Sequence, residues 1–193
     1  MARWEPGTAE RLQEAALELF ATRGFEQTTV TDIAGAVGLT ERTFFRHFSD
    51  KREALFHGQR LLADAFLSGV AAAPDGAAPV EAVARALRSA AAFFPEERRP
   101  HARTRQSVID QNPALREREL LKLANLAATL ADALRARGIG DLTASLAAQS
   151  GITVFGLAFT QWIAEDERRP FTEIAESVLH ELRTLTATPA PPE

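Results

Sequence analysis

The sequence predicts an all-α fold of about nine helices. Apolar residues recur three and four positions apart through almost all of the chain, and no segment shows the strict alternation of a β-strand. Glycine and proline signals divide the periodic stretches into separate helices. With 193 residues, 46% hydrophobic and 25% charged, the composition is that of an ordinary globular protein. We therefore expect neither a disordered nor a fibrous chain.

The N-terminal part predicts three short helices. The first is expected over residues 8–23, and Gly24 ends it. The second begins after Thr29, an N-cap residue with Asp32 three positions on, and ends at Gly38. A third helix follows almost at once, so two short helices are joined by a tight glycine turn.

The third helix begins after Thr40 and has two different faces. At about 100° per residue, Phe48 lies on the same side as Phe44, whereas Arg42 and Arg46 lie about 160° away from Phe44. An outward basic face on the second helix of a tight pair is typical of a helix-turn-helix, whose recognition helix reaches base edges. A solvated basic face on a small helical hairpin is the alternative.

The order of motifs over residues 8–56 resembles one family. The stretches "LFATRGFEQTTV", "IAGAVGLTERTFFRHF" and "SDKREALF" are similar to the DNA-binding region of the tetracycline-repressor (TetR) family of bacterial transcriptional regulators. The resemblance implies base-reading roles for Arg42 and Thr43, with Glu41 as a third candidate. It implies contacts with the DNA backbone for Phe45, His47, Lys51 and either Thr28 or Thr29.

Phe45 departs from the family pattern. The family often has tyrosine at this position, and a phenol donates a hydrogen bond to a phosphate oxygen whereas a phenyl ring does not. We expect Arg46, on the outward face, to replace part of that contact. A histidine packed at the helix end is the alternative for His47, and a solvated lysine is the alternative for Lys51.

The remainder of the chain is expected to be helical. A fourth helix runs from about Asp50 past Val70 to the loop "AAAPDGAAP", and later helices are expected at residues 80–94, 101–111, 113–137, 142–165 and 171–187. With the resemblance, the chain divides into a helix-turn-helix DNA-binding domain at 1–50, a ligand-binding and dimerisation domain at 51–188, and a disordered tail at 189–193.

The last two long helices are the expected homodimer interface. The helix at 142–165 has apolar residues on two sides. Burial within one monomer accounts for one of these sides but less easily for both. The resemblance implies that these helices pair with their symmetry mates as a four-helix interface. Two recognition helices about 34 Å apart then read a palindromic operator in double-stranded DNA.

The resemblance also implies a small-molecule effector that releases DNA, with repression as the usual mode. Aromatic residues on several helices are candidates for the pocket, and two polar residues are candidate anchors. These residues are Phe66, Phe93, Phe94, Phe155, Phe159 and Trp162, with Arg103 or Gln106 as the anchors. Packing of the aromatics as solid core is the alternative.

Several classes of function are disfavoured. The absence of cysteine removes disulfides and thiolate metal sites and fits a cytoplasmic protein. No run of about 18 uncharged apolar residues is recognised, so no membrane span is expected. The net charge of -4 limits any DNA contact to a local patch. No catalytic or metal-binding motif occurs, so we expect neither an enzyme nor a cofactor. The rival function is a helical ligand-binding or protein-interaction module without sequence-specific DNA binding.

Overall fold

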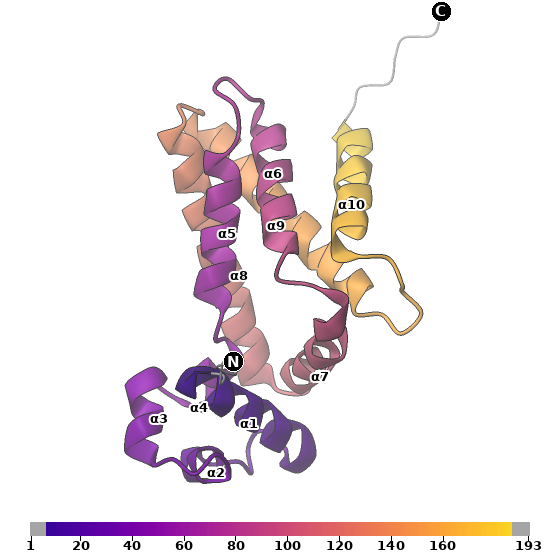
Figure 1. Cartoon of the computed structure of the whole chain (residues 1–193). Coiled ribbons are helices and arrows are strands. Elements are labelled where there is room, and N and C mark those ends of the chain that lie inside the picture. Colours follow the sequence, from indigo (N-terminus) through magenta and orange to yellow (C-terminus); the bar gives the residue numbers. More distant parts are fainter. Residues whose placement is uncertain (1–6, 187–193) are drawn as a thin grey trace, which may run out of the picture. The chain divides into compact units, whose positions relative to one another are not determined.

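The computed structural model describes residues 7–186, and this part of the chain is all-α, as the sequence predicts (Figure 1). It contains ten α-helices and one 3-10 turn. The helices are α1 (Thr8–Arg23), α2 (Val30–Ala36), α3 (Glu41–His47), α4 (Lys51–Leu55), α5 (Gln59–Ala71), α6 (Pro79–Ala91), α7 (Arg99–Asp110), α8 (Pro113–Ala136), α9 (Asp141–Trp162) and α10 (Phe171–Thr186), with the 3-10 turn at Glu96–Arg98. The tail expected to be disordered lies outside the described residues.

The chain forms two compact units whose boundary differs from the expected one. Of the described residues, 7–60 and 101–121 belong to the first unit, and 61–100 and 122–186 belong to the second. The difference arises because Val108 and Ile109 of α7 and Leu115 of α8 are buried in the same core as the N-terminal helices. Helical periodicity shows which faces are apolar but does not show what each face packs against.

Helix caps define the N-terminal helices of the first unit. The Thr29 side chain accepts a hydrogen bond from the Asp32 N–H, and the Asp32 carboxylate accepts one from the Thr29 N–H. The Thr40 side chain accepts from the Thr43 N–H at the start of α3. Each cap satisfies backbone N–H groups that have no partner within the helix, so both predicted N-caps are confirmed.

The expected fourth helix is broken, and this prediction of a continuous helix was wrong. α4 begins after Asp50, whose carboxylate accepts hydrogen bonds from the N–H groups of Arg52 and Glu53. The helix ends after five residues, and Gly58 follows with φ +89°. Glycine adopts this left-handed region without steric cost, so the chain turns there and restarts as α5. The break gives ten helices instead of nine.

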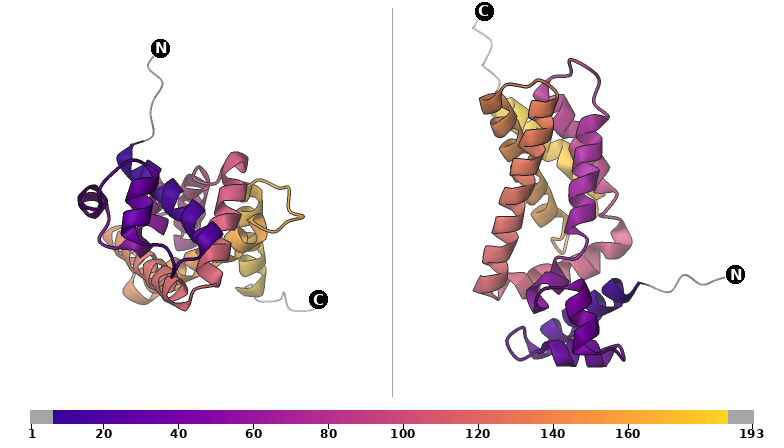
Figure 2. Two further views of the ribbon diagram at one scale, coloured as in Figure 1. Left: turned by 90° about the horizontal axis from the view of Figure 1, so that it is seen from below. Right: turned by 90° about the vertical axis from the view of Figure 1, so that its left-hand side faces the viewer.

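Close helix packing builds the core of the second unit. α6, α9 and α10 pack against one another (Figures 1 and 2). A Cβ atom at Gly69 of α5 would lie 2.5 Å from the Cα of Ala86, and one at Gly151 of α9 would lie 2.7 Å from a Val83 methyl group. Both positions therefore require a residue without a side chain for α5 and α9 to approach α6 this closely.

α9 is apolar on more than one face. Its buried side includes Val154, Phe155 and Trp162, whereas Leu142 and Leu146 are 72% and 60% exposed. By length and composition alone α9 is long and apolar enough to cross a membrane, which the sequence analysis did not recognise. A helix buried in a protein core meets the same criterion, and α9 packs against α6 and α10 in the second unit.

A buried arginine fastens the α9–α10 loop. One Nη of Arg99 donates to Glu96 Oε1 at 2.7 Å and to the Arg169 carbonyl at 2.7 Å, and the other donates to the Glu167 carbonyl. The guanidinium carbon lies 5.1 Å from the ring centroid of Trp162. A charge removed from water needs this many partners, so Arg99 holds the loop in one conformation.

Candidate nucleic-acid interface

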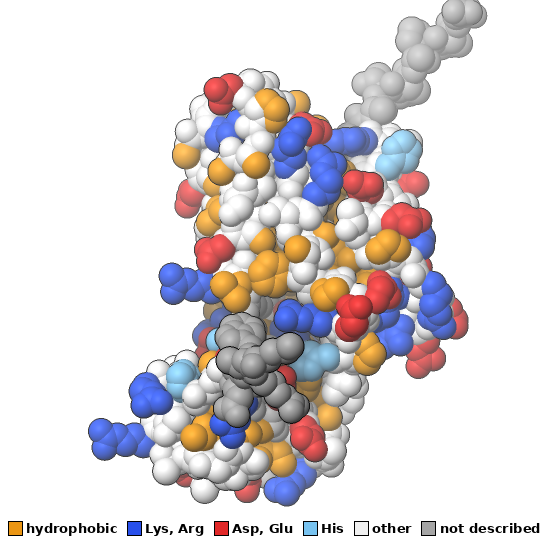
Figure 3. Space-filling view, viewed as in Figure 1, with side chains coloured by type: hydrophobic (Ala, Val, Ile, Leu, Met, Phe, Trp, Pro, Cys, Tyr) orange, Lys and Arg blue, Asp and Glu red, His pale blue; other side chains and the backbone are white. Residues whose placement is uncertain are grey.

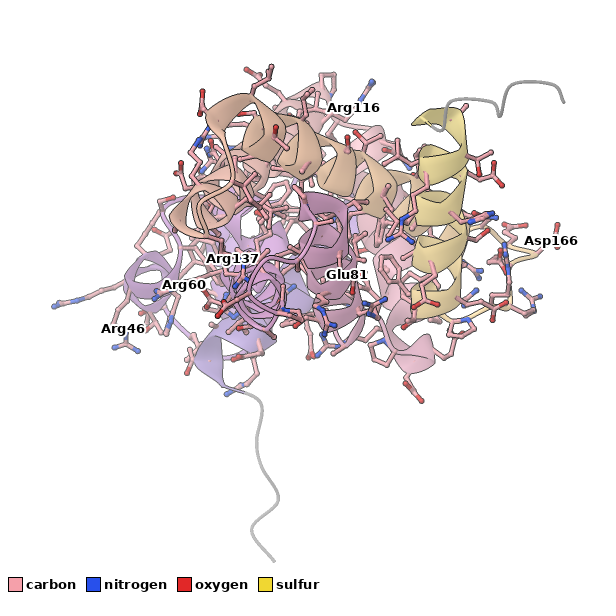
Figure 4. The ribbon with its side chains drawn as sticks, turned by 90° about the horizontal axis from the view of Figure 1, so that it is seen from above. Arg46, Arg60, Glu81, Arg116, Arg137 and Asp166 are labelled. Carbon is pink, nitrogen blue, oxygen red and sulfur yellow. The ribbon has the colours of Figure 1, made fainter. Side chains whose placement is uncertain are left out.

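α3 has one buried and one exposed face, as its spacing predicts. Phe44 and Phe48 are 0% and 5% exposed and lie with ring centroids 5.3 Å apart. Arg42, Phe45 and Arg46 are exposed, with Phe45 54% accessible. Figure 3 has the same view as Figure 1, and basic side chains project from the region of α3. Figure 4 shows that Arg46 extends away from the helices. The outward face therefore offers two guanidinium groups and a phenyl ring.

Hydroxyl groups orient the residues at the start of α3. The Thr31 hydroxyl, on α2, donates to Glu41 Oε1. The hydroxyl oxygens of Thr40 and Thr43 lie 3.1 Å apart, and Thr43 is half-buried. The three residues predicted to read bases, Glu41, Arg42 and Thr43, are thus consecutive at the N-terminal end of the exposed helix. Side-chain hydrogen bonds hold Glu41 and Thr43 in place.

The start of α2 exposes one of the two threonines proposed for phosphate contact. Thr29 is exposed, and its hydroxyl donates to Asp32 Oδ2 at 2.6 Å. This hydrogen bond and the one from the Thr29 backbone lower the pKa of Asp32. Thr28 is 1% exposed, and its hydroxyl donates to the Gly24 carbonyl at 2.8 Å. The prediction that Thr28 contacts a phosphate is therefore corrected, because its hydroxyl is buried in the turn after α1.

Lys51 has a structural environment that the sequence analysis missed. Its Nζ donates to the carbonyls of Phe25 at 2.7 Å and Thr28 at 3.1 Å, and it lies 4.2 Å from the centroid of the Phe25 ring. A further bond to the Glu26 carbonyl occupies the third N–H. An ammonium group has three donors, and all three of these bind carbonyls of the α1–α2 loop. The prediction that Lys51 contacts a phosphate is therefore corrected, because its donors hold this loop. Its carbonyl partners lie 23 to 26 residues away, where no local pattern reveals them.

His47 is exposed at the end of α3. Its ring centroid lies 6.4 Å from that of the buried Phe48. An imidazole edge in this position has access to solvent, so the environment does not match a histidine packed in the core. His47 therefore remains available as a hydrogen-bond donor beside Arg46.

The predicted pocket aromatics gather in the second unit. Ring centroids lie 5.5 Å apart for Phe66 and Phe155, 5.7 Å for Phe94 and Phe159, and 5.6 Å for Phe94 and Trp162. Phe171 of α10 joins them, stacked on Phe94 at 4.5 Å. Phe171 was not among the residues predicted to line the pocket. Phe93 is half-buried in the turn that follows α6. We call these rings, without Phe93, the aromatic cluster.

The two polar pocket candidates belong to the first unit. Gln106 donates to Asp110 at 3.0 Å and to Glu119 at 3.2 Å. Arg103 lines an open hollow of about 320 Å³ with Phe20, Thr104, Ser107 and Gln111 among its neighbours. The aromatic candidates and the polar candidates thus lie in different units. Among residues 7–186, no group of three His, Cys, Asp or Glu side chains is arranged to hold a metal ion.

Comparison with known proteins identifies the family. Residues 12–57 match the family described as bacterial regulatory proteins, tetR family, and residues 77–187 match the MftR C-terminal domain. Over 169 residues the chain is 30% identical to the putative mycofactocin biosynthesis transcriptional regulator MftR of Mycobacterium tuberculosis (strain ATCC 25618 / H37Rv), which covers 86% of this chain and 84% of the relative. The chain belongs to the TetR family.

Other relatives agree with this assignment to the TetR family. The HTH-type transcriptional regulator TcmR of Streptomyces glaucescens is 42% identical over 82 residues, or 42% of this chain, and the match spans 36% of TcmR. The TetR-family repressor FadR of Thermus thermophilus, solved in complex with lauroyl-CoA, is 26% identical with a TM-score of 0.54, covering 96% of this chain and 100% of FadR. The protein is therefore a DNA-binding transcriptional regulator of the TetR family, as the resemblance of its N-terminal quarter implies.

Proposed function

We propose that this TetR-family protein is a homodimeric repressor that binds a palindromic operator and leaves it when a small-molecule effector binds. One observation carries the proposal. α3 exposes Arg42, Phe45 and Arg46 on one side and buries Phe44 completely on the other. A helix anchored by its apolar face and basic on its free face is suited to the major groove.

The proposed DNA contacts divide by their chemistry. Glu41, Arg42 and Thr43 contact base edges from the first turn of α3. Phosphate and sugar contacts come from Thr29, Phe45, Arg46 and His47. Phe45 contributes apolar contact with sugar or a thymine methyl group, and Arg46 contributes charge. Thr28 and Lys51 are left out because their polar atoms bind within the first unit.

The proposed dimer interface is an exposed stripe on α9. Its members are spaced three or four residues apart over 19 residues, the pattern of a helix seam that receives another helix. The stripe consists of Leu142, Leu146, Gln149, Thr153, Leu157 and Thr160, all exposed in the single chain. Leu185 near the end of α10 is also exposed, at 82%. Burial of these leucines against a second copy is favourable by about 25 cal/mol per Å².

The proposed effector has a large apolar part. The aromatic cluster provides the apolar side chains that line small-molecule sites, and Phe159 within it is half-buried. Because the rings contact one another, an entering ligand must separate them, and this provides the link between binding and conformational change. The complex of T. thermophilus FadR with lauroyl-CoA makes an acyl thioester a reasonable first probe. Arg103 and Gln106 belong to the first unit and are not part of this proposal.

We infer that the protein acts by binding and not by catalysis, and that it works in the cytoplasm where its DNA is. Its relatives are transcriptional regulators. The four histidines lie at separate points of the sequence, without the spacing of a metal or catalytic motif.

Selection of binding sites from random duplex DNA tests the function. We expect enrichment of a palindrome whose half-site centres lie about one helical turn, 34 Å, apart or a multiple of it. Fluorescence anisotropy with the selected duplex then measures release by lauroyl-CoA, with coenzyme A as the control ligand. Failure to enrich any palindrome would favour a helical ligand-binding module without sequence-specific DNA binding.

A further inference from the structure

Glu41 and Thr31 form a hydrogen-bonded pair between the two helices of the helix-turn-helix. Glu41 is the first residue of α3, and the Thr31 hydroxyl on α2 donates to its Oε1. Both side chains are exposed. The main consequence of this bond is that the carboxylate has a fixed orientation at the start of the recognition helix.

The chemistry of the carboxylate limits what it can contact on DNA. An ionised carboxylate only accepts hydrogen bonds, and the negative phosphates repel it. On the major-groove edges, guanine N7 and O6 and thymine O4 are also acceptors. The donors are the N4 amine of cytosine and the N6 amine of adenine. Adenine places its N7 acceptor beside N6, so a carboxylate is opposed there by a second lone pair. Cytosine has no such acceptor.

We propose that Glu41 accepts a hydrogen bond from the N4 amine of one cytosine in each operator half-site, and that Thr31 is its positioning residue. The inference rests on the proposed function, in which α3 enters the major groove. Thr31 occupies Oε1 by donating to it, and Oε2 accepts no hydrogen bond from residues 7–186. One carboxylate oxygen is therefore held by the protein, and the other is left for a single base contact.

The test compares binding-site selections for the wild type, Glu41→Gln and Thr31→Val, followed by affinity measurements on single-base variants of the selected duplex. For the wild type, replacing the cytosine lowers affinity about tenfold. A glutamine amide donates and accepts, so Glu41→Gln moves the preference at that position from cytosine to adenine. Thr31→Val keeps the side-chain shape and removes the donor, so the loss of affinity on replacing the cytosine falls from about tenfold to about threefold. Thr31→Ser keeps the hydroxyl and restores the tenfold loss.

Matched outcomes separate the possible failures. Glu14→Gln removes the same charge from an exposed position on α1 and is expected to leave the base preference unchanged. Base reading by Glu41 is overturned if Glu41→Gln does not shift the base preference at this position. It is also overturned if Glu14→Gln shifts that preference equally. Undiminished discrimination in Thr31→Val overturns the positioning role. If the wild type itself selects no palindrome, the proposed function fails instead.

Discussion

At the residue scale, Phe45 is the clearest departure from a typical recognition helix. Its ring is 54% exposed beside two outward arginines, on the surface proposed to face DNA. We expect Phe45→Tyr to tighten operator binding several-fold, or about 1 kcal/mol, by adding one neutral hydrogen bond. The dependence of affinity on salt should not change, because the hydroxyl is uncharged.

Fluorescence anisotropy titrations at three salt concentrations measure this effect. Phe45→Leu is the control, since it changes the apolar contact without adding a donor. Equal affinities for Phe45→Tyr and the wild type would show that this flank of α3 does not reach the DNA backbone.

Lys51 provides a second test at the residue scale. Lys51→Met keeps the aliphatic stem but removes the donors to the Phe25, Glu26 and Thr28 carbonyls. We expect the free energy of unfolding to fall by about 2 kcal/mol, because hydrogen bonds from a charged group are lost and carbonyls lose their partner. The salt dependence of DNA binding should stay the same.

Arg46→Ala is the matched variant for Lys51→Met. Its side chain is exposed, so stability should change by less than about 0.5 kcal/mol, whereas the slope of log affinity against log salt should fall by about 1. Urea unfolding and DNA titrations measure the two effects separately. The reverse pattern, with a changed salt slope for Lys51→Met, would restore Lys51 as a phosphate contact.

These residues show what a sequence reveals about a site. The angular spacing on α3 predicted that Phe44 and Phe48 are buried and that Arg42 and Arg46 are exposed, because a short helix fixes its own geometry. The environments of Thr28 and Lys51 depend on how a loop folds back on a helix distant in sequence. The same limit applies to the Thr31 bond to Glu41, which periodicity does not specify.

At the scale of elements, the α9–α10 loop has a carboxylate that responds to acid. Glu167 accepts hydrogen bonds from the Arg169 side chain at 2.6 Å and from the N–H groups of Arg169 and Arg168 at 2.9 Å. These bonds lower its pKa from 4.5 to about 2. A folded-state pKa below the unfolded value contributes stability above pH 4.5, and this contribution is lost as the pH falls toward 2.

We therefore expect Glu167→Gln to unfold at lower urea concentration than the wild type at pH 7. The difference should shrink below pH 4.5 and be nearly lost at pH 2, where about half of the wild-type carboxyl groups are protonated in the folded state. Asp166→Asn is the control, because Figure 4 shows Asp166 extending away from the helices. A difference that is constant with pH would indicate lost packing and not a lost ionised contact.

Element boundaries were predictable where a local cap or stop signal was present. Thr29 and Thr40 start α2 and α3 as expected, and their side chains accept the predicted hydrogen bonds. The break between α4 and α5 was missed because a single glycine within apolar periodicity is also compatible with a continuous helix. The positive φ of Gly58 is a property of the folded chain that the pattern did not indicate.

At the scale of the whole molecule, the family and the all-α fold were predictable and the compact units were not. The ordered match over residues 12–57 carries the family. The division into units depends on which apolar faces meet, and α7 buries Val108 and Ile109 in the core of the first unit although it follows α6 in sequence. The mostly apolar composition of α9 fits a membrane span as well as a core helix, so composition alone did not decide its environment.

The proposed dimer predicts the consequence of a charge in the α9 stripe. Leu146 is 60% exposed in the single chain, so Leu146→Glu should leave the fold of each protomer intact. In a symmetric interface the new carboxylate appears twice and is removed from water on association, which is strongly unfavourable. We expect a monomer by sedimentation at micromolar concentration and operator affinity at least about 100-fold weaker, because one recognition helix binds without the second.

Ala128→Glu, at an exposed position on α8 outside the stripe, is the control and should stay dimeric. Circular dichroism before the titrations verifies that both variants keep their helix content. If Leu146→Glu sediments as a dimer and binds the operator with wild-type affinity, the exposed leucines of α9 do not form the interface. The two recognition helices would then be held at the spacing of the operator by another surface of the second unit.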